Sequence, residues 1–354
     1  MIPSDLAPRI LVGHVLEQLR TLPDESVQCV VTSPPYWGLR AYGTEPQVWG
    51  GEAEHAHEWL ADTCACGAWK GELGLEPTPD LFVSHLADVF DEARRVLRVD
   101  GILWLNLGDS YNGSGKGPTG RNGIQKAERR QEFINRPSAA PDLKPKDLVG
   151  VPWMAAFELR RRGWWLRSDC IWAKPNPMPE SVADRPTRSH EYVFLLTKSE
   201  RYFYDADAVR TAYSRSTMPE IGAKYDGVAT KSFREYRAQD ASEAKRSMIR
   251  SLERNGGANL RSVWWIPTQP YPEAHFATYP EMLPKLCIKA STRAQDVVLD
   301  PFCGSGTTLW VARQLGRRVI GIELNPKYAV LARRRCLAAV PDIETAPAYE
   351  EARA

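Results

Sequence analysis

Two short segments near opposite ends of this chain contain the residue types best suited to chemistry. The first is Thr32-Ser33-Pro34-Pro35-Tyr36-Trp37, and the second is Asp300-Pro301-Phe302-Cys303-Gly304-Ser305-Gly306-Thr307-Thr308. Each follows a short apolar run rich in valine, which predicts a buried strand that ends abruptly in a turn. A glycine-rich turn after a strand favours a nucleotide-like cofactor. A Ser-Pro-Pro-aromatic turn favours a pocket for a planar amine.

The second turn has the features of a cofactor site. Gly304 and Gly306 let the backbone turn tightly and approach a ligand closely, and the helix expected after them offers its free N–H groups. About 20 residues later the expected strand 318–324 carries Glu323, whose carboxylate suits ribose hydroxyls. Leu309 replaces the third glycine of a dinucleotide motif, and no lysine follows the glycines as in a phosphate-binding loop. A strand–helix turn that binds nothing is the alternative.

The first turn suits the activation of an exocyclic amine on a nucleobase. Such an amine is a poor nucleophile because its lone pair is delocalised into the ring. The Ser33 hydroxyl and the Pro34 carbonyl can accept its two N–H hydrogens, and the two prolines stiffen the turn. Tyr36 can stack on a base that has left the duplex. A surface turn with a packed aromatic is the alternative, but the two turns together indicate methyl transfer to a nucleobase.

The elements that must position these turns alternate between strands and helices, which predicts a parallel α/β sheet. We expect Gly101 to end the helix that precedes the strand 102–107. The expected helices are 15–22, 80–97, 151–162, 279–290, 307–315 and a final one near the C-terminus. The expected strands are one that begins at residue 10, then 27–31, 102–107, 166–172, 192–197, a strand ending at Asp300, and 318–324.

Three motifs in order resemble those of S-adenosylmethionine-dependent DNA amino-methyltransferases of the β class. They are the first turn, the segment His275–Leu283 that precedes the cofactor motif, and the second turn. The resemblance covers about residues 10–337, apart from a polar region and two insertions. It implies a Rossmann-like methyltransferase fold with a circularly permuted motif order. The implied sheet has seven strands and is mainly parallel, with helices on both faces and one antiparallel strand near its edge.

The resemblance also assigns site residues. The catalytic set is Ser33, Pro34, Pro35 and Tyr36. The set for S-adenosyl-L-methionine is Asp300, Pro301, Phe302, Cys303, Gly304, Ser305, Gly306, Thr307, Thr308, Glu323, Leu324, Asn325, His275, Phe276, Thr278 and Pro280. Relatives that modify adenine usually carry Asp or Asn where this chain has Ser33, so the resemblance favours the N4-cytosine branch. An N6-adenine enzyme and a catalytically inactive DNA-binding regulator remain alternatives. Asp109 either faces the same pocket or caps a loop.

Two insertions and a polar region interrupt the resemblance. The catalytic half is 1–204 with insertions 50–72 and 113–145, the expected target-recognition region is 205–261, the cofactor half is 262–345, and 346–354 is a tail. The first insertion contains His55, His57, Cys64 and Cys66, a set that could bind a structural zinc ion tetrahedrally. One residue between the cysteines is fewer than zinc sites usually have, so unligated surface residues are the alternative.

Composition restricts the partners. The net charge of +2 is small, so any DNA-binding surface must be local, and the basic residues of 113–145 and 205–261 suit phosphate contacts with double-stranded DNA. Seven irregularly spaced cysteines do not form a disulfide framework. No signal-peptide layout and no apolar run of about 20 residues occurs, so we expect a cytoplasmic protein without membrane contact. The sequence leaves the target site, a cognate restriction endonuclease and the oligomeric state open.

Overall fold

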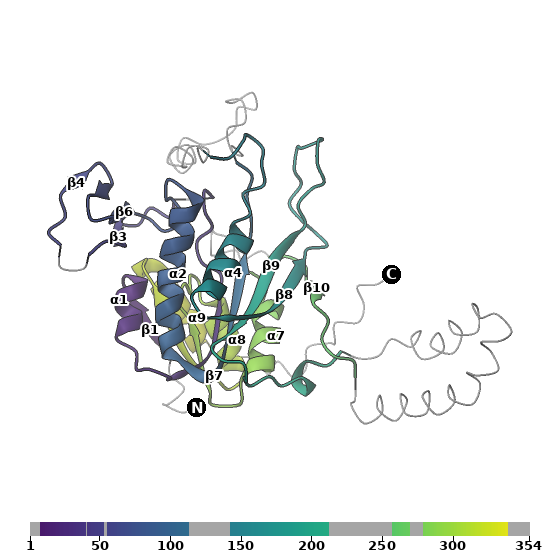
Figure 1. The fold of residues 1–354 in the computed structure, drawn as a ribbon. Helices are drawn as coiled ribbons and strands as arrows, with labels where there is room; N and C mark the ends of the chain where they lie inside the picture. The colour runs from purple at the N-terminus through teal and green to yellow at the C-terminus, as the bar shows by residue number, and fades with distance from the viewer. Residues whose placement is uncertain are drawn as a thin grey trace. The chain divides into compact units, whose positions relative to one another are not determined.

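The computed structural model in Figure 1 describes residues 8–39, 41–52, 55–112, 142–211, 257–269 and 279–338. Residues 1–203 and 262–354 form one compact unit, and residues 204–261 form another. Most of the second unit lies outside the described residues, and so does most of the insertion 113–145. In its described part, the second unit contains a short 3₁₀ helix, η2 (Asp207–Val209), and an isolated bridge between Thr211 and Ala258.

The first unit is built on a sheet of eight strands in the order β1-β12-β11-β2-β7-β9-β8-β10. Only β9 runs antiparallel to its neighbours, and it lies near one edge as expected. The seven-strand prediction was wrong, because the short strand β10 pairs in parallel with β8 and extends the sheet. The strands are β1 (Arg9–Val12), β2 (Val27–Thr32), β7 (Leu97–Leu107), β8 (Trp165–Ala173), β9 (His190–Thr197), β10 (Val263–Trp265), β11 (Val297–Asp300) and β12 (Arg318–Glu323).

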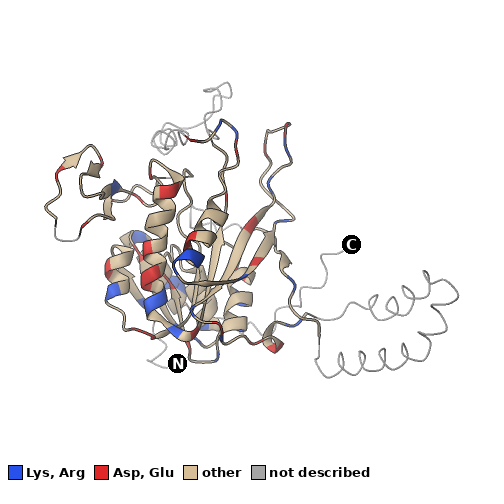
Figure 2. Ribbon diagram, in the orientation of Figure 1, with Lys and Arg blue, Asp and Glu red and all other residues tan. Residues whose placement is uncertain are grey.

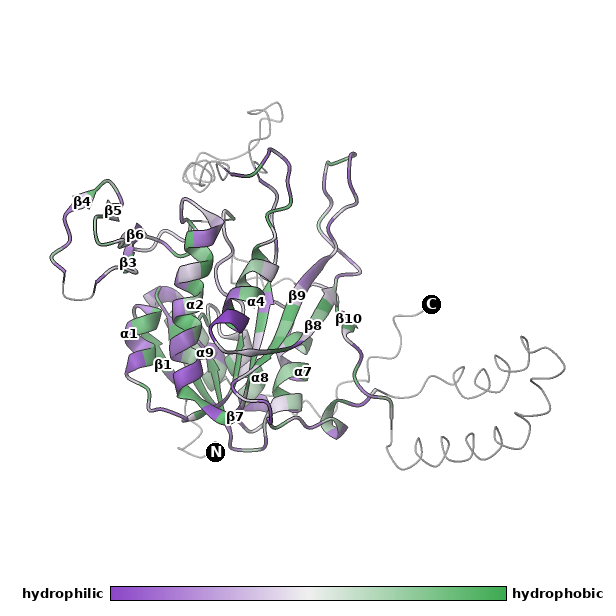
Figure 3. Cartoon of the chain, in the orientation of Figure 1, coloured by the Kyte–Doolittle hydropathy of each residue, from purple (hydrophilic) through white to green (hydrophobic). Residues whose placement is uncertain are grey.

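Helices cover both faces of this sheet, as the doubly wound fold requires (Figure 1). On one face α2 contacts both α1 and α4, and on the other face α8 contacts both α7 and α9. Most of the buried residues of α2 are apolar, and β2 is buried along its whole length and mostly hydrophobic (Figure 3). The helices are α1 (Val15–Arg20), α2 (Pro79–Val96), α4 (Val151–Arg161), α7 (Met282–Ser291), α8 (Thr307–Gln314) and α9 (Pro326–Leu337).

Charged residues occur along α2 and at the end of α4 (Figure 2). Arg162, directly after α4, donates to Asp88 and Asp91 on α2 at 2.6 and 2.7 Å. These ion pairs join the two helices at the surface of the unit. Among the helices that the structure describes, none is both long and apolar enough to cross a membrane.

The role predicted for Gly101 was wrong. Helix α2 ends at Val96, and β7 begins at the next residue, so Gly101 lies inside the strand. A Cβ atom at this position would lie 2.9 Å from the carbonyl oxygen of Gln28 on the neighbouring strand. Glycine is therefore needed here for the close approach of two strands and not for ending a helix.

The insertion after the first turn forms a second, antiparallel sheet in the order β3-β6-β5-β4. Its strands are only two or three residues long, which is too short to leave a periodic pattern in the sequence. Trp49 and Trp69 stack on His85 of α2, with ring centroids 5.8 and 5.7 Å from it. The strands are β3 (Gln47–Trp49), β4 (Trp59–Leu60), β5 (Thr63–Cys64) and β6 (Trp69–Gly71).

Candidate active site

The two chemically promising turns lie at the same edge of the main sheet. Strands β2 and β11 are parallel neighbours, with Cys29 opposite Val298 and Val30 opposite Leu299. Because parallel neighbours end at the same edge, the turn after β2 meets the turn after β11. Ligands of open α/β sheets bind in the crevice outside this edge.

Asp300 is the first residue of the predicted cofactor turn, residues 300–308, and its hydrogen bonds connect this turn to β2. Its carboxylate accepts hydrogen bonds from Thr32 Oγ1 at 2.7 Å, Thr308 Oγ1 at 2.6 Å and the backbone N–H of Phe302 at 3.1 Å. The hydroxyl of Tyr279 also donates to it, at 3.4 Å. Burial raises the pKa of Asp300, and the hydrogen bonds oppose that shift. In this structure the predicted cofactor residue Asp300 therefore serves to join the two turns.

Glycine is required at one position of the cofactor turn and leaves open space at another. Gly306 has φ +83°, and a Cβ atom there would lie 2.8 Å from the Cβ atom of Ala332 on α9. Gly304 has φ +49°, and its missing Cβ atom would point into open space. Helix α8 follows directly. Its N-cap residue is Gly306, which has no side chain to bond the first N–H groups of the helix. Open space at Gly304 and free N–H groups at the start of α8 fit a nucleotide-like cofactor.

Leu309 has a structural partner that explains the absent third glycine. A Cβ atom at Gly321 of β12 would lie 2.5 Å from Leu309 Cδ1. In the dinucleotide motif the third glycine serves close helix–strand packing. Here the glycine on the strand provides that space, so α8 packs closely with leucine on the helix.

Several other residues of the predicted cofactor set support the turn from inside. Arg335 of α9 donates to the carbonyl oxygen of Ser305 at 2.9 Å and to Thr307 Oγ1 at 3.2 Å. Cys303 and Thr308 are buried beneath the turn, and Pro280 is buried before α7. His275, Phe276 and Thr278 lie outside the described residues.

Glu323 ends β12 beside the cofactor turn. One carboxylate oxygen accepts from the backbone N–H of Gly304 at 2.9 Å, and the other accepts from that of Asn325 at 2.8 Å. Burial raises the pKa of Glu323. The backbone of Leu324 also bonds to this carboxylate, which offers about four lone-pair sites, so acceptor capacity remains for a ligand hydroxyl group. Asn325 itself caps α9 by accepting from Lys327 N, and Leu324 lies between these two residues.

The predicted catalytic turn, residues 32–37, is held by a polar network that the sequence did not reveal. Asn106 Nδ2 donates to Tyr36 Oη at 2.8 Å, to Glu191 Oε2 at 2.9 Å and more weakly to Ser33 Oγ at 3.4 Å. Ser33 Oγ donates to Tyr36 Oη at 3.0 Å, and Tyr36 Oη donates to Glu191 at 2.7 Å. Lys174 pairs with the second oxygen of Glu191 at 2.5 Å. The other members of this network thus fix the position of the Ser33 hydroxyl.

Two features of this network bear on its chemistry. Burial and the nearby Glu191 carboxylate raise the pKa of Tyr36 well above its usual value, so the phenol stays neutral and acts as a donor. The other atom of the Asn106 amide, the acceptor Oδ1, is buried and has no hydrogen-bond partner among the described residues. An unsatisfied buried acceptor is costly, and a ligand N–H would satisfy it. The one sequence signal for this site was a polar residue inside the apolar run 102–107.

The other residues predicted to be catalytic lie beside this network. Pro34 is buried and Pro35 is partly buried, which agrees with a stiff turn. A Cβ atom at Gly108 would lie 2.6 Å from the ring of Tyr36, so the chain passes closely across that ring. One side of Tyr36 borders a small pocket lined also by Trp37, Leu39, Gly108, Asp109, Ser110 and Val151.

Asp109, the second candidate for this pocket, belongs to its lining and also has a capping role. Its carboxylate accepts from the backbone N–H groups of Gly150 and Val151 at 3.0 and 3.2 Å. These groups lie at the start of α4, where the N-cap residue Gly150 has no side chain to provide a cap. Asp109 therefore stabilises the N-terminus of α4.

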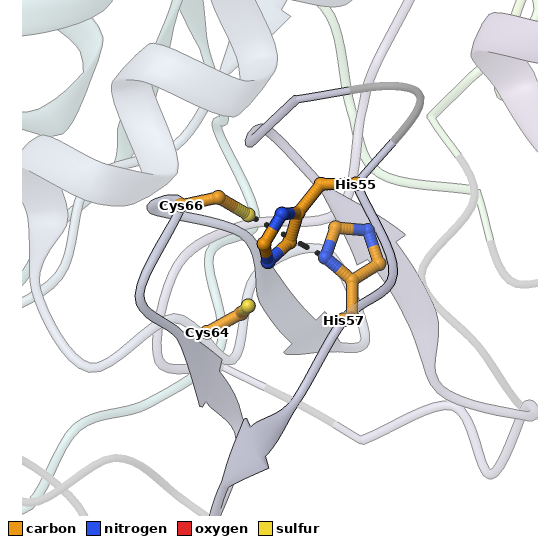
Figure 4. A group of neighbouring side chains, drawn as sticks. All are labelled: His55, His57, Cys64 and Cys66. Atoms are coloured by element: carbon orange, nitrogen blue, oxygen red, sulfur yellow. Dashed lines mark hydrogen bonds between the residues drawn. The ribbon is translucent and has the colours of Figure 1, made fainter.

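The four predicted metal ligands of the first insertion come together in space. His55, His57, Cys64 and Cys66 each offer a ligand atom, and these atoms lie within 4.8 Å of one another (Figure 4). Cys66 Sγ and His57 Nδ1 are in direct contact, at 3.4 Å.

Comparison with known proteins identifies the family of this chain. The sequence model of a family described as DNA methylase, covering N6 and N4 enzymes, matches residues 27–334. The type II methyltransferase M.Cfr9I of Citrobacter freundii is 42% identical over 323 residues, which are 91% of this chain and 85% of that protein.

Two solved structures share the fold. The cytosine-N4-specific PvuII DNA methyltransferase has a TM-score of 0.56 and 17% identity, covering 96% of this chain and 89% of its own. A Thermus thermophilus protein solved with S-adenosyl-L-methionine has a TM-score of 0.51 and 22% identity, covering 94% of this chain and 95% of its own. Because the family match extends over both turns and the sheet between them, the chain belongs to the N6/N4 DNA methylase family.

Proposed function

We propose that this protein transfers a methyl group from S-adenosyl-L-methionine to the N4 amine of a cytosine flipped out of double-stranded DNA. The observation that carries the proposal is the position of Ser33. It follows β2 at the sheet edge that also bears the cofactor turn, and a buried network orients its hydroxyl. The likeness to M.Cfr9I, a type II methyltransferase, supports site-specific modification of DNA.

The residues of the turn act by positioning the amine. Ser33 Oγ and the Pro34 carbonyl accept its N–H hydrogens, and the lone pair is thereby turned toward the cofactor. Asn106 Oδ1, which lacks a partner among the described residues, is a further acceptor beside Ser33. The cofactor supplies an electrophilic methyl group on a sulfonium. Tyr36, held by Glu191, offers its ring as a surface against which the flipped base packs.

The cofactor is assigned to the turn after β11. Gly304, Gly306 and the uncapped start of α8 form its cradle, and Glu323 is the acceptor for ribose hydroxyls. The likeness to a structure that contains S-adenosyl-L-methionine supports this assignment.

Recognition of DNA is assigned to residues 205–261. This stretch separates the catalytic half from the cofactor half and is rich in Lys and Arg, which suit phosphate contacts. The type II class of the relatives also favours a cognate restriction endonuclease as a functional partner.

The test is to identify the methylated nucleoside. Duplex DNA treated with the protein and S-adenosyl-L-methionine is digested to nucleosides and analysed by mass spectrometry. We expect N4-methylcytosine in a fixed sequence context. N6-methyladenine alone would support the second candidate, an adenine enzyme, and no methylation of any substrate would favour a DNA-binding regulator.

Ser33→Ala sharpens this test. It removes an acceptor used in the transition state, so turnover should fall about 100-fold while cofactor affinity stays unchanged. The matched control is Ser26→Ala, just before the other end of β2, where the hydroxyl donates to Pro23 O. A Ser33→Ala protein with full turnover would remove Ser33 from the mechanism.

A further inference from the structure

The insertion beside the catalytic turn contains a cluster that the proposed methyl transfer does not use. His55 and His57 precede β4, Cys64 ends β5, and Cys66 lies in the turn before β6. The four side chains converge from these segments, as Figure 4 shows. We propose that they bind one zinc ion, which holds the outer part of this small sheet in place.

The geometry is close to that of a tetrahedral site. A zinc ion with Zn–S distances of about 2.3 Å and Zn–N distances of about 2.0–2.1 Å places its ligand atoms roughly 3.3–3.8 Å apart. The separation between Cys66 Sγ and His57 Nδ1 is 3.4 Å, and none of the separations exceeds 4.8 Å. Two thiolates and two imidazoles are the donor set that selects zinc over magnesium or calcium.

The backbone explains why one residue between the cysteines is enough. The N–H of Cys64 donates to Ala68 O and that of Gly67 donates to Cys64 O, each at 2.9 Å, which closes a tight turn around Cys66. Gly67 has φ +86°, a conformation that favours glycine. The turn brings both sulfur atoms to the same side.

The chain is also shaped around the Cys66 sulfur. Backbone groups of Glu52 and Ala68 hydrogen-bond to it. A Cβ atom at Gly51 would lie 2.9 Å from that sulfur and 2.6 Å from Ala68 Cβ, so only glycine fits there. Backbone donors around a sulfur atom are the surroundings that stabilise a metal-bound thiolate, because they satisfy its remaining lone pairs.

The outer part of the sheet needs a cross-link because it has little core of its own. The inner part is anchored by Trp49 and Trp69 on His85. The outer hairpin pairs only two residues on each strand, and Leu60 is 83% exposed. A short two-stranded hairpin is marginal in water, so a metal that joins it to the 55–57 segment would supply the missing stability.

Four protein ligands leave no open position for a substrate, so the metal is structural. The insertion is nevertheless connected to the predicted catalytic turn, because the residues on its two sides bond to each other and to that turn. Gly38 N donates to Gly74 O at 2.8 Å, and Trp37 Nε1 donates to Glu76 O at 2.9 Å. The residues that flank the insertion thus lie beside Ser33-Pro34-Pro35-Tyr36.

The test is the metal content of the full chain, purified without a histidine tag or chelator. Mass spectrometry of the metals should find about one zinc per chain, the content of a single four-ligand site. Blocking the thiols with a mercurial should release it, and a zinc-sensitive dye would record the release. Cobalt should replace the zinc and give the visible absorption of a tetrahedral thiolate site. Metal-free protein with free thiols, or with a Cys64–Cys66 disulfide, would overturn the proposal.

Variants distinguish the proposed zinc ligands from neighbouring residues that do not bind the metal. Cys64→Ser and His57→Gln should lose the zinc and make residues 50–72 sensitive to protease. Glu58→Gln changes an exposed neighbour of His57 and should keep the metal. If the ligand variants fail to fold, zinc release from the wild-type chain decides the matter. Full zinc retention in both folded ligand variants would contradict the site, whereas cofactor affinity should be unaffected throughout.

Discussion

Thr32 donates a hydrogen bond of 2.7 Å from its hydroxyl to Asp300, a residue 268 positions later in the chain. Thr32 ends the strand before the catalytic turn, and Asp300 ends the strand before the cofactor turn. Both side chains are buried, with 0% and 2% exposure. The bond therefore fixes the distance between the residues proposed to hold the amine and those proposed to hold the methyl donor.

Removing this hydrogen-bonded link should chiefly lower the free energy of unfolding. Asp300→Ala removes the acceptor of Thr32 and of Phe302 N and leaves Thr308 a longer bond to Val31 O, at a cost of roughly 1–3 kcal/mol for each unsatisfied group. Thr32→Val removes one donor and should cost about 1 kcal/mol. Urea unfolding of the wild type and both variants measures the difference. Equal stability of Asp300→Ala and wild type would show that the carboxylate is dispensable for the fold.

Glu323→Gln should weaken cofactor binding. The amide offers one acceptor oxygen where the carboxylate offers two, so it cannot satisfy Gly304 N, Asn325 N and a ligand hydroxyl together. We expect the Kd for S-adenosyl-L-methionine, measured by calorimetry, to rise about tenfold or more, which corresponds to roughly 1.4 kcal/mol. Glu200→Gln, at an exposed position, serves as the control. Unchanged affinity would remove Glu323 from the cofactor site.

Glu191→Gln should slow turnover without affecting cofactor affinity. One oxygen of Glu191 accepts from Tyr36 and Asn106, and the other pairs with Lys174. An amide at this position would present N–H groups to one of these donors and so disturb the orientation of Ser33. We expect kcat to fall about tenfold to 100-fold with little change in the KM for cofactor.

Lys174→Met provides the matched comparison for this network. It keeps the aliphatic stem but removes the ion pair with Glu191. A smaller loss of kcat in Lys174→Met than in Glu191→Gln is expected, because the bonds to Tyr36 and Asn106 remain. If neither variant changed kcat, the network would be structural only.

Exchange of residues 205–261 tests the proposed recognition region. Replacing them by the corresponding stretch of a relative with another target should change the sequence that is methylated. Cofactor affinity should stay constant, since both turns belong to the other unit. Sequencing of DNA methylated in cells reads out the target. A folded, active hybrid with the original target would place recognition elsewhere, for instance in the insertion 113–145.

The sequence by itself determined the parallel α/β fold, the two turns and the four clustered residues of the insertion. These features depend on local rules, because strand and helix periods, glycine turns and stiff proline pairs are all encoded within a few residues. The antiparallel strand near the sheet edge also followed correctly from the family resemblance.

Only the tertiary structure decided which polar groups meet. Asn106 and Glu191 lie on two different strands, Lys174 directly follows a third, and nothing in their local sequences links them to Ser33. Asp300 likewise has the sequence features of a ligand residue, but its oxygen atoms are engaged by Thr32 and Thr308. Hydrogen bonds between distant segments depend on strand order and register, which a single sequence does not state.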